Sequence, residues 1–164
     1  MDLGRKSALL LIPFFIFPIL AGSALVWGQS ETSPPLPDSP GKDTFVSVCS
    51  LCHAPTTPFG KQWTRKEWEL KVTEMLQEEP DVTREERAAI VEYLAANFKP
   101  GGKIYINKAD AKDLVSALEI SAAEAEALVA YRQKEGVFRT FDDMKKVTGF
   151  NSSKIEGKKD RLVF

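Results

Sequence analysis

The sequence of 164 residues contains a single histidine and only two cysteines. Three such side chains are too few for a four-ligand structural zinc site, which would need a carboxylate to complete it. A hydrolytic site that uses two histidines is excluded for the same reason. The formal net charge is −1, so the basic character that is typical of a strong nucleic-acid binder is also absent.

Only one long apolar run is present, from Ala8 to Trp27, and two basic residues precede it. This order predicts an export signal over residues 1–28. Cleavage after Ala24 or after Gly28 fits the pattern. A retained anchor, and hence a membrane tether, is the alternative, because a run of this length spans a bilayer. In either case we expect the remainder in the periplasm or at the outer face of the cytoplasmic membrane.

Proline is absent after position 100, although the chain contains ten prolines. Four of them fall within residues 29–42 and predict an extended, semi-rigid linker. A second break, Lys-Pro-Gly-Gly-Lys, covers residues 99–103. The charge balance changes there as well, from net −4 over residues 29–100 to net +2 over residues 101–164. We therefore predict two small modules, at 43–100 and at 103–164.

Sheet patterns are also scarce, whereas helix starts are frequent. Three segments fit the Ser/Thr-x-x-Glu capping box, in which a hydroxyl and a carboxylate satisfy the first free amides of a helix. They begin at Thr64, Thr83 and Ser121. Only the short segments 104–106 and 162–163 are candidates for strand pairing. The sequence therefore predicts an all-α protein.

The two cysteines and the histidine occur together, as Cys49-Ser50-Leu51-Cys52-His53. This C-x-x-C-H spacing is that of c-type haem attachment. On a short helical turn Cys49 and Cys52 can each bond a haem vinyl group, while His53 is directed at the iron. A disulfide, a thioredoxin-like redox pair and a metal site are the alternatives.

The segment around this motif resembles a small class I cytochrome c domain. The resemblance implies that the first and last helices cross beside the haem with an aromatic contact, for which Phe45 and Tyr93 are the candidates. Met75 lies 22 residues after His53. It resembles the methionine that completes the iron in short cytochrome domains of the quinohaemoprotein and sulfite-dehydrogenase type. The alternative is that Met75 is a core residue, and Met144 is predicted to be core in the second module.

Residues 104–164 resemble the tandem helix-hairpin-helix module of the competence DNA-receptor family and of a photosystem II extrinsic subunit. The resemblance rests on a pattern of spaced residues: Ile106-Asn107, Ala109, Leu114, Ala130-Tyr131-Arg132, Gly136, Phe138, Phe141, Asp142, Val147, Gly149 and Ile155. DNA-binding versions carry a Gly-hydrophobic-Gly turn in each hairpin. The first hairpin here reads Glu119-Ile120-Ser121, without either glycine, and the second reads Gly149-Phe150-Asn151. Six basic residues near the second hairpin favour weak phosphate binding or form a solvated face: Lys145, Lys146, Lys154, Lys158, Lys159 and Arg161.

These observations lead to an expectation about function. We expect an exported c-type cytochrome without enzymatic activity, in which one covalent haem c transfers single electrons to and from redox partner proteins. Cys49, Cys52, His53 and Met75 bind the cofactor, and His53 and Met75 are the iron ligands. The alternative is an extracytoplasmic DNA-binding protein of the competence type with an accessory haem. If Met75 does not bind the iron, an open haem that binds a small ligand or peroxide is a further possibility.

Overall fold

The structure, a computed structural model, describes residues 34–164. The predicted export segment, 1–28, and the first part of the linker lie outside the described residues. Between Pro34 and Phe164, none of the helices has the length and apolar character needed to cross a bilayer.

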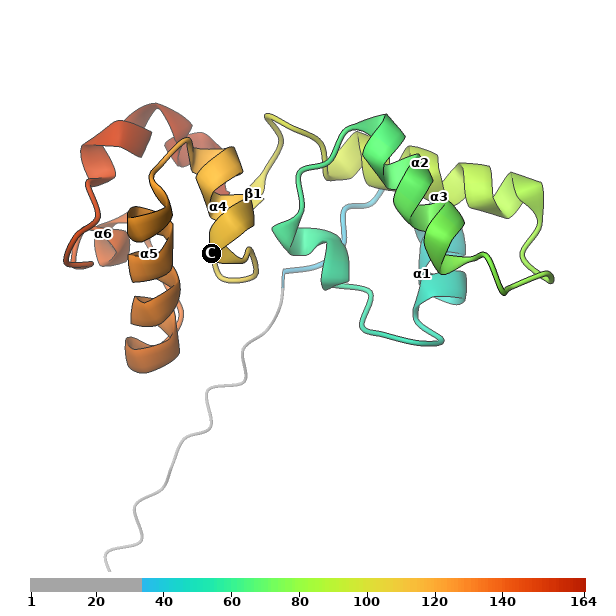
Figure 1. Cartoon of the computed structure of the whole chain (residues 1–164), viewed down its shortest axis with the longest axis horizontal. Coiled ribbons are helices and arrows are strands. Elements are labelled where there is room, and N and C mark those ends of the chain that lie inside the picture. The colour runs from blue at the N-terminus through green and yellow to red at the C-terminus, as the bar shows by residue number, and fades with distance from the viewer. Residues whose placement is uncertain (1–33) are drawn as a thin grey trace, which may run out of the picture. The chain divides into compact units, whose positions relative to one another are not determined.

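The first group of helices follows the predicted starts closely (Figure 1). It consists of α1 (Lys42–Cys49), the 3₁₀ helix η1 (Thr57–Gly60), α2 (Arg65–Met75) and α3 (Arg84–Asn97). Thr64 and Thr83 form complete capping boxes with Glu67 and Glu86, as predicted. Each box satisfies two of the amides that a helix start leaves without an intrahelical partner.

The second group contains β1 (Ile104–Tyr105), α4 (Ala111–Leu118), α5 (Ala122–Glu135), α6 (Phe141–Met144), the 3₁₀ helix η2 (Ser152–Arg161) and β2 (Leu162–Val163). The two short strands pair in parallel, Ile104 with Leu162 and Tyr105 with Val163. The predicted capping box at Ser121 is present, and Thr140 forms another with Asp143 that the sequence reading missed. The described chain is therefore mostly helical, as expected.

One hydrophobic cluster lies among α1, α2 and α3. The Phe45 and Tyr93 rings stack with centroids 5.2 Å apart, which confirms the aromatic contact predicted between the first and last helices. The buried indole of Trp68 donates to the Phe98 carbonyl at 2.9 Å. Burying these aromatic side chains contributes about 2 kcal/mol or more each, so this cluster orients the three helices.

A second cluster lies among α4, α5 and the C-terminal segment. Met144 is fully buried there, as predicted. Phe138 is buried, and Tyr131, Phe141 and Phe150 pack against the same cluster while remaining partly exposed. Arg132 donates to the carbonyls of Ile106 and Ala109, so it ties α5 to the start of the module.

The end of the predicted linker contacts α3. Leu36 packs against the first cluster, and Pro37 O accepts a hydrogen bond from the Tyr93 hydroxyl at 3.1 Å. Asn97 donates to Ser39 Oγ at 2.8 Å. These contacts fix the direction in which the chain enters α1.

Candidate functional site

Cys49 is the last residue of α1, and Phe45 lies one helical turn before it. Since residues four apart share a helix face, the buried Phe45 turns Cys49 toward the first cluster, where it is half-buried. Cys52 and His53 lie in the exposed turn that follows, and both thiols are free. Burial, and then the neighbouring Cys52, raise the pKa of the Cys49 thiol. Reactive redox pairs of the thioredoxin type depend on a lowered pKa, so this environment does not favour that alternative.

The Thr57 hydroxyl lies next to the histidine ring. It donates to the Ala54 carbonyl at 2.6 Å and lies 3.5 Å from Nδ1 of His53. When the ring proton is on Nδ1, a contact of this kind leaves Nε2 as the electron-pair donor. Metal-binding histidines are typically held by such a contact at the other nitrogen. Sequence reasoning missed Thr57, and its position four residues after His53 was the available signal.

An apolar pocket of about 170 Å³ lies between this turn and the helices. Its walls are made of apolar atoms, and it is lined by residues from α1, η1, α2 and α3: Phe45, Cys49, His53, Thr57, Pro58, Lys61, Trp63, Trp68, Lys71, Val72, Met75, Leu76, Ile90 and Leu94. Three of the four predicted site residues, Cys49, His53 and Met75, therefore line one pocket. Cys52 is exposed and is not among the lining residues.

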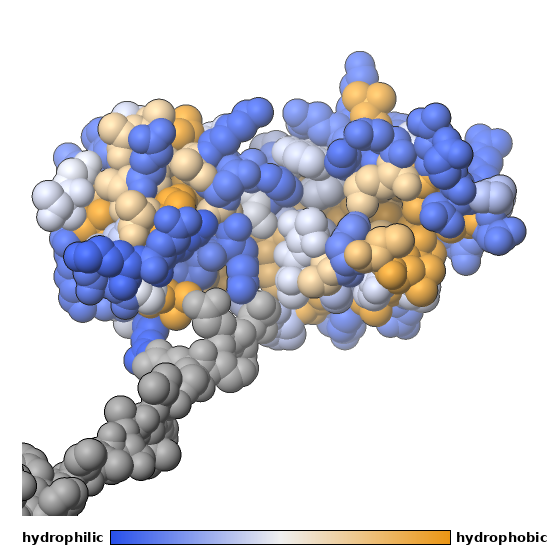
Figure 2. Space-filling model, turned by 60° about the horizontal axis from the view of Figure 1, so that its bottom comes forward, coloured by the Kyte–Doolittle hydropathy of each residue, from blue (hydrophilic) through white to orange (hydrophobic). Residues whose placement is uncertain are grey.

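Met75 reaches this pocket from the last turn of α2 and is 44% exposed. The interpretation as an ordinary core residue does not fit that exposure. Two other large apolar residues are exposed on these helices and turns, Leu51 at 83% and Leu70 at 62%. Figure 2 shows apolar surface, in orange, on the part of the chain formed by α1 to α3, with hydrophilic side chains around it.

The loop that forms one wall of the pocket also packs against the C-terminal module. Phe59 stacks on Tyr105 with ring centroids 4.3 Å apart and an interplanar angle of 4°. Lys61, which lines the pocket, forms ion pairs with Asp113 at 2.6 Å and Asp110 at 3.1 Å. The C-terminal module therefore packs against the pocket loop, through residues that lie about fifty positions apart in the sequence.

Each of the two hairpins contains a residue with positive φ at the same place in its turn, despite their different sequences. Gly149 has φ of 85° and Glu119 has φ of 59°, so both occupy the left-handed region. Glu119 is the one non-glycine residue with positive φ among residues 34–164. A carboxylate side chain thus takes the place where glycine fits without strain.

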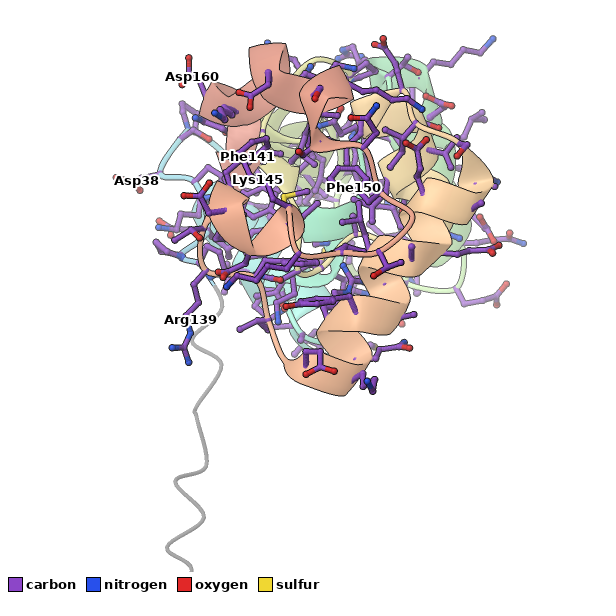
Figure 3. All side chains as sticks on the ribbon, turned by 90° about the vertical axis from the view of Figure 1, so that its left-hand side faces the viewer. Asp38, Arg139, Phe141, Lys145, Phe150 and Asp160 are labelled. Carbon is purple, nitrogen blue, oxygen red and sulfur yellow. The ribbon has the colours of Figure 1, made fainter. Side chains whose placement is uncertain are left out.

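The five lysines predicted to cluster near the second hairpin all form ion pairs. The pairs are Lys145–Asp142, Lys146–Asp143, Lys154–Glu124, Lys158–Glu119 and Lys159–Glu156, at 2.5 to 3.1 Å. Figure 3 shows Phe141, Lys145 and Phe150 on this face, and Lys159 Nζ lies 4.3 Å from the centroid of the Phe141 ring. The positive charge that a phosphate backbone would meet is therefore largely compensated within the module.

Comparison with known proteins supports the helix-hairpin-helix half of the chain. A family model described as a helix-hairpin-helix motif matches residues 99–163. An uncharacterized protein of Haemophilus influenzae is 36% identical over 63 residues, which cover 38% of this chain and 56% of the relative. ComE operon protein 1 of Bacillus subtilis is 32% identical over 63 residues, which cover 38% of this chain and 31% of the relative. The chain therefore spans about half of one relative and a third of the other.

No solved structure matches the chain. The comparisons show a helix-hairpin-helix region similar to that of ComE operon protein 1 and do not support the cytochrome assignment, which rests on the residues and geometry described above.

Proposed function

We propose that the chain is an exported c-type cytochrome, in which one covalent haem transfers single electrons and the helix-hairpin-helix region docks the protein to a partner. The observation that carries this proposal is the pocket that Cys49, His53 and Met75 line together. The residues fit the group, because an apolar wall, an attachment thiol and two iron-ligand types meet in one place.

The pocket residues have distinct roles in this proposal. Cys49 and Cys52 would hold the haem through thioether bonds, each made by addition of the S–H across a vinyl group. His53 and Met75, which line the same pocket, would supply the two iron ligands. A haem held in this way supplies a one-electron iron couple.

The surroundings favour electron transfer over catalysis. A haem iron held by both His53 and Met75 would have no ligand position left for a substrate. Phe45, Trp68 and Leu94 exclude water from the interior side of the pocket. A pocket of about 170 Å³ is smaller than one that encloses a whole drug-sized ligand, so a bound haem would remain partly accessible to a redox partner.

Absorption spectroscopy of the full chain, expressed in a host with haem c maturation machinery, tests this proposal. We expect sharp α and β bands after dithionite reduction and a methionine–iron charge-transfer band in the oxidised protein. Met75→Ala abolishes that band, whereas Met144→Leu, a change of the methionine buried in the other cluster, leaves it intact. Absence of covalent haem from the wild-type protein would overturn the proposal.

The second candidate is extracytoplasmic DNA binding of the competence type. The match to the helix-hairpin-helix family model and the similarity to ComE operon protein 1 favour it. The paired lysines and the substituted loop at Glu119 do not. A gel-shift assay with duplex DNA at low and moderate salt distinguishes the candidates, because phosphate contacts weaken steeply as salt rises. No shift at low salt would exclude the second candidate.

A further inference from the structure

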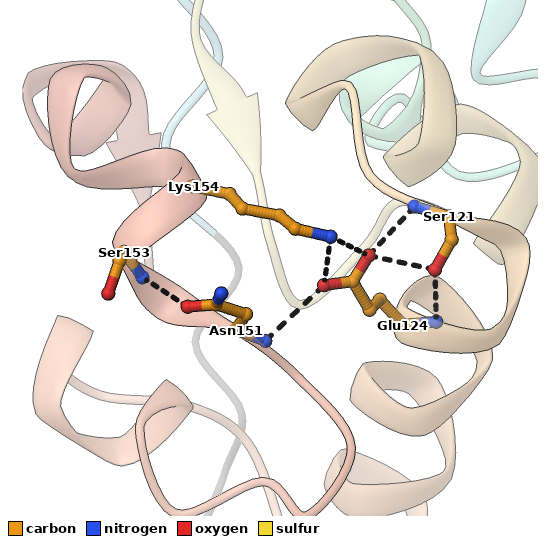
Figure 4. A network of polar contacts seen from close by, with 5 residues as sticks. All are labelled: Ser121, Glu124, Asn151, Ser153 and Lys154. Atoms are coloured by element: carbon orange, nitrogen blue, oxygen red, sulfur yellow. Dashed lines mark hydrogen bonds and ion pairs between the residues drawn. The ribbon is translucent and has the colours of Figure 1, made fainter.

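The C-terminal module contains a buried carboxylate that contacts both hairpins (Figure 4). Glu124, in the first turn of α5, is 6% exposed. In the first hairpin its Oε2 accepts from the Ser121 amide at 3.0 Å and from the Ser121 hydroxyl at 2.7 Å. In the second hairpin its Oε1 accepts from the Asn151 amide at 3.4 Å, and Lys154 Nζ lies 2.9 Å from both oxygens.

Ser121 and Asn151 hold equivalent places in the two hairpins. Each comes two residues after the left-handed residue of its turn, and each is the N-cap of the helix that follows. Amides at such a turn and at a helix N-terminus attract anions. Here the equivalent amides of two hairpins, about thirty residues apart in the sequence, converge on one carboxylate.

The electrostatics agree with this geometry. Hydrogen bonds from the Ser121 backbone, and then from Lys154, lower the pKa of Glu124 to about 2. The carboxylate is therefore ionised at neutral pH, and the positive charge of Lys154 is compensated within the module. The anion that these donors bind is therefore the carboxylate of Glu124, a residue of the chain itself.

We propose that the Glu124 carboxylate occupies the anion-binding position formed by the two hairpin loops. An external phosphate can bind at this position only when the carboxylate is removed. The inference does not depend on the haem. The donors involved are the amides of Ser121 and Asn151 together with Lys154. Because Glu124 accepts from all of them, the module keeps its hairpin geometry while these donors are not available to an external ligand.

Thermal unfolding of the full chain in inorganic phosphate, against chloride at matched ionic strength, tests the proposal. Removal of the carboxylate in Glu124→Ala takes away the acceptor of four donors, which are the Ser121 amide and hydroxyl, the Asn151 amide and Lys154 Nζ. We expect the unfolding midpoint of this variant to rise with phosphate by about 3 °C or more, because a ligand that binds only the folded state stabilises it. Wild type and Glu126→Ala, which removes an exposed carboxylate from the same helix, show no such rise.

Two results would overturn the proposal. One is a phosphate response of the wild type equal to that of Glu124→Ala, since the loops would then be open with the carboxylate in place. The other is no phosphate response in either protein. If Glu124→Ala does not fold, amide hydrogen exchange of the wild type decides the matter. Slow exchange at both Ser121 and Asn151 is expected, and fast exchange at these two amides contradicts a closed site.

Discussion

Gly60 is a position at which the backbone of the pocket loop lies close to the backbone of the C-terminal module. It ends η1, next to Lys61, and an added Cβ would lie 3.0 Å from Ala109 Cα and 3.1 Å from the Lys108 carbonyl oxygen. Both contacts are with backbone, which cannot rotate away as the end of a side chain can. Its φ lies outside the left-handed region, so alanine meets a packing conflict there and no dihedral strain.

The expected magnitude follows from those distances. Carbon atoms pack best at about 3.5–4.0 Å, so the new methyl group would be at least about 0.5 Å too close to Ala109. Overpacking of this kind costs about 1–3 kcal/mol. Gly60→Ala is therefore expected to lower the free energy of unfolding by that amount. The matched control is Gly157→Ala in η2, where an added Cβ meets nothing within 4 Å and φ is also outside the left-handed region. The control is expected to stay within about 0.5 kcal/mol of wild type or to gain about 0.4–1 kcal/mol.

Urea unfolding followed by tryptophan fluorescence measures the effect, because Trp63 and Trp68 line the pocket beside the loop that contains Gly60. If the chain binds haem as proposed, Gly60→Ala is also expected to shift the reduction potential, since Lys61 and Trp63 of the same loop line the pocket. Gly157→Ala is expected to leave the potential unchanged. If Gly60→Ala were as stable as wild type, or if both variants lost equal stability, the packing of the module behind the pocket loop would be refuted.

Four further predictions concern the hairpins and the first cluster. Glu119→Gly removes left-handed backbone strain of about 1–2 kcal/mol. It also removes a surface ion pair with Lys158, which contributes about 0.2–1 kcal/mol. Because the strain is the larger of the two, the urea midpoint should rise slightly. Gly149→Ala, the same turn position in the second hairpin, should lower the midpoint instead, and equal effects of the two changes would argue against equivalent turns. The Glu124 contribution to stability is complete above the ordinary carboxyl pKa near 4.5 and is lost as pH falls toward 2, so wild type and Glu124→Gln should converge in acid. Phe45→Ala removes a fully buried ring stacked on Tyr93 and should cost about 3–5 kcal/mol by urea unfolding, and a loss below 1 kcal/mol would contradict its place in the core.

Much of the local structure was predictable, because it depends on residues close in sequence. The capping boxes at Thr64, Thr83 and Ser121 each need one hydroxyl and one carboxylate three positions apart. The aromatic pair of Phe45 and Tyr93 was predicted from the resemblance to a cytochrome c domain, not from a local pattern, and the structure places the two rings in contact. The domain boundaries, the export segment and the haem remain predictions.

Other features required the folded chain. His53 and Met75 line the same pocket only because α2 packs on α3 and returns its last turn toward α1. Lys61 had no recognisable role in the sequence, since its partners Asp110 and Asp113 belong to the other module.

Glu124 shows the difference most clearly. The sequence by itself determined its capping box with Ser121, because that interaction closes within one helical turn. Only the tertiary structure decided that the same carboxylate also receives Asn151 and Lys154, since those donors arrive from a second hairpin about thirty residues away. A short hydrogen-bonded ring is specified by spacing, whereas a contact between hairpins depends on how the hydrophobic cluster between them packs.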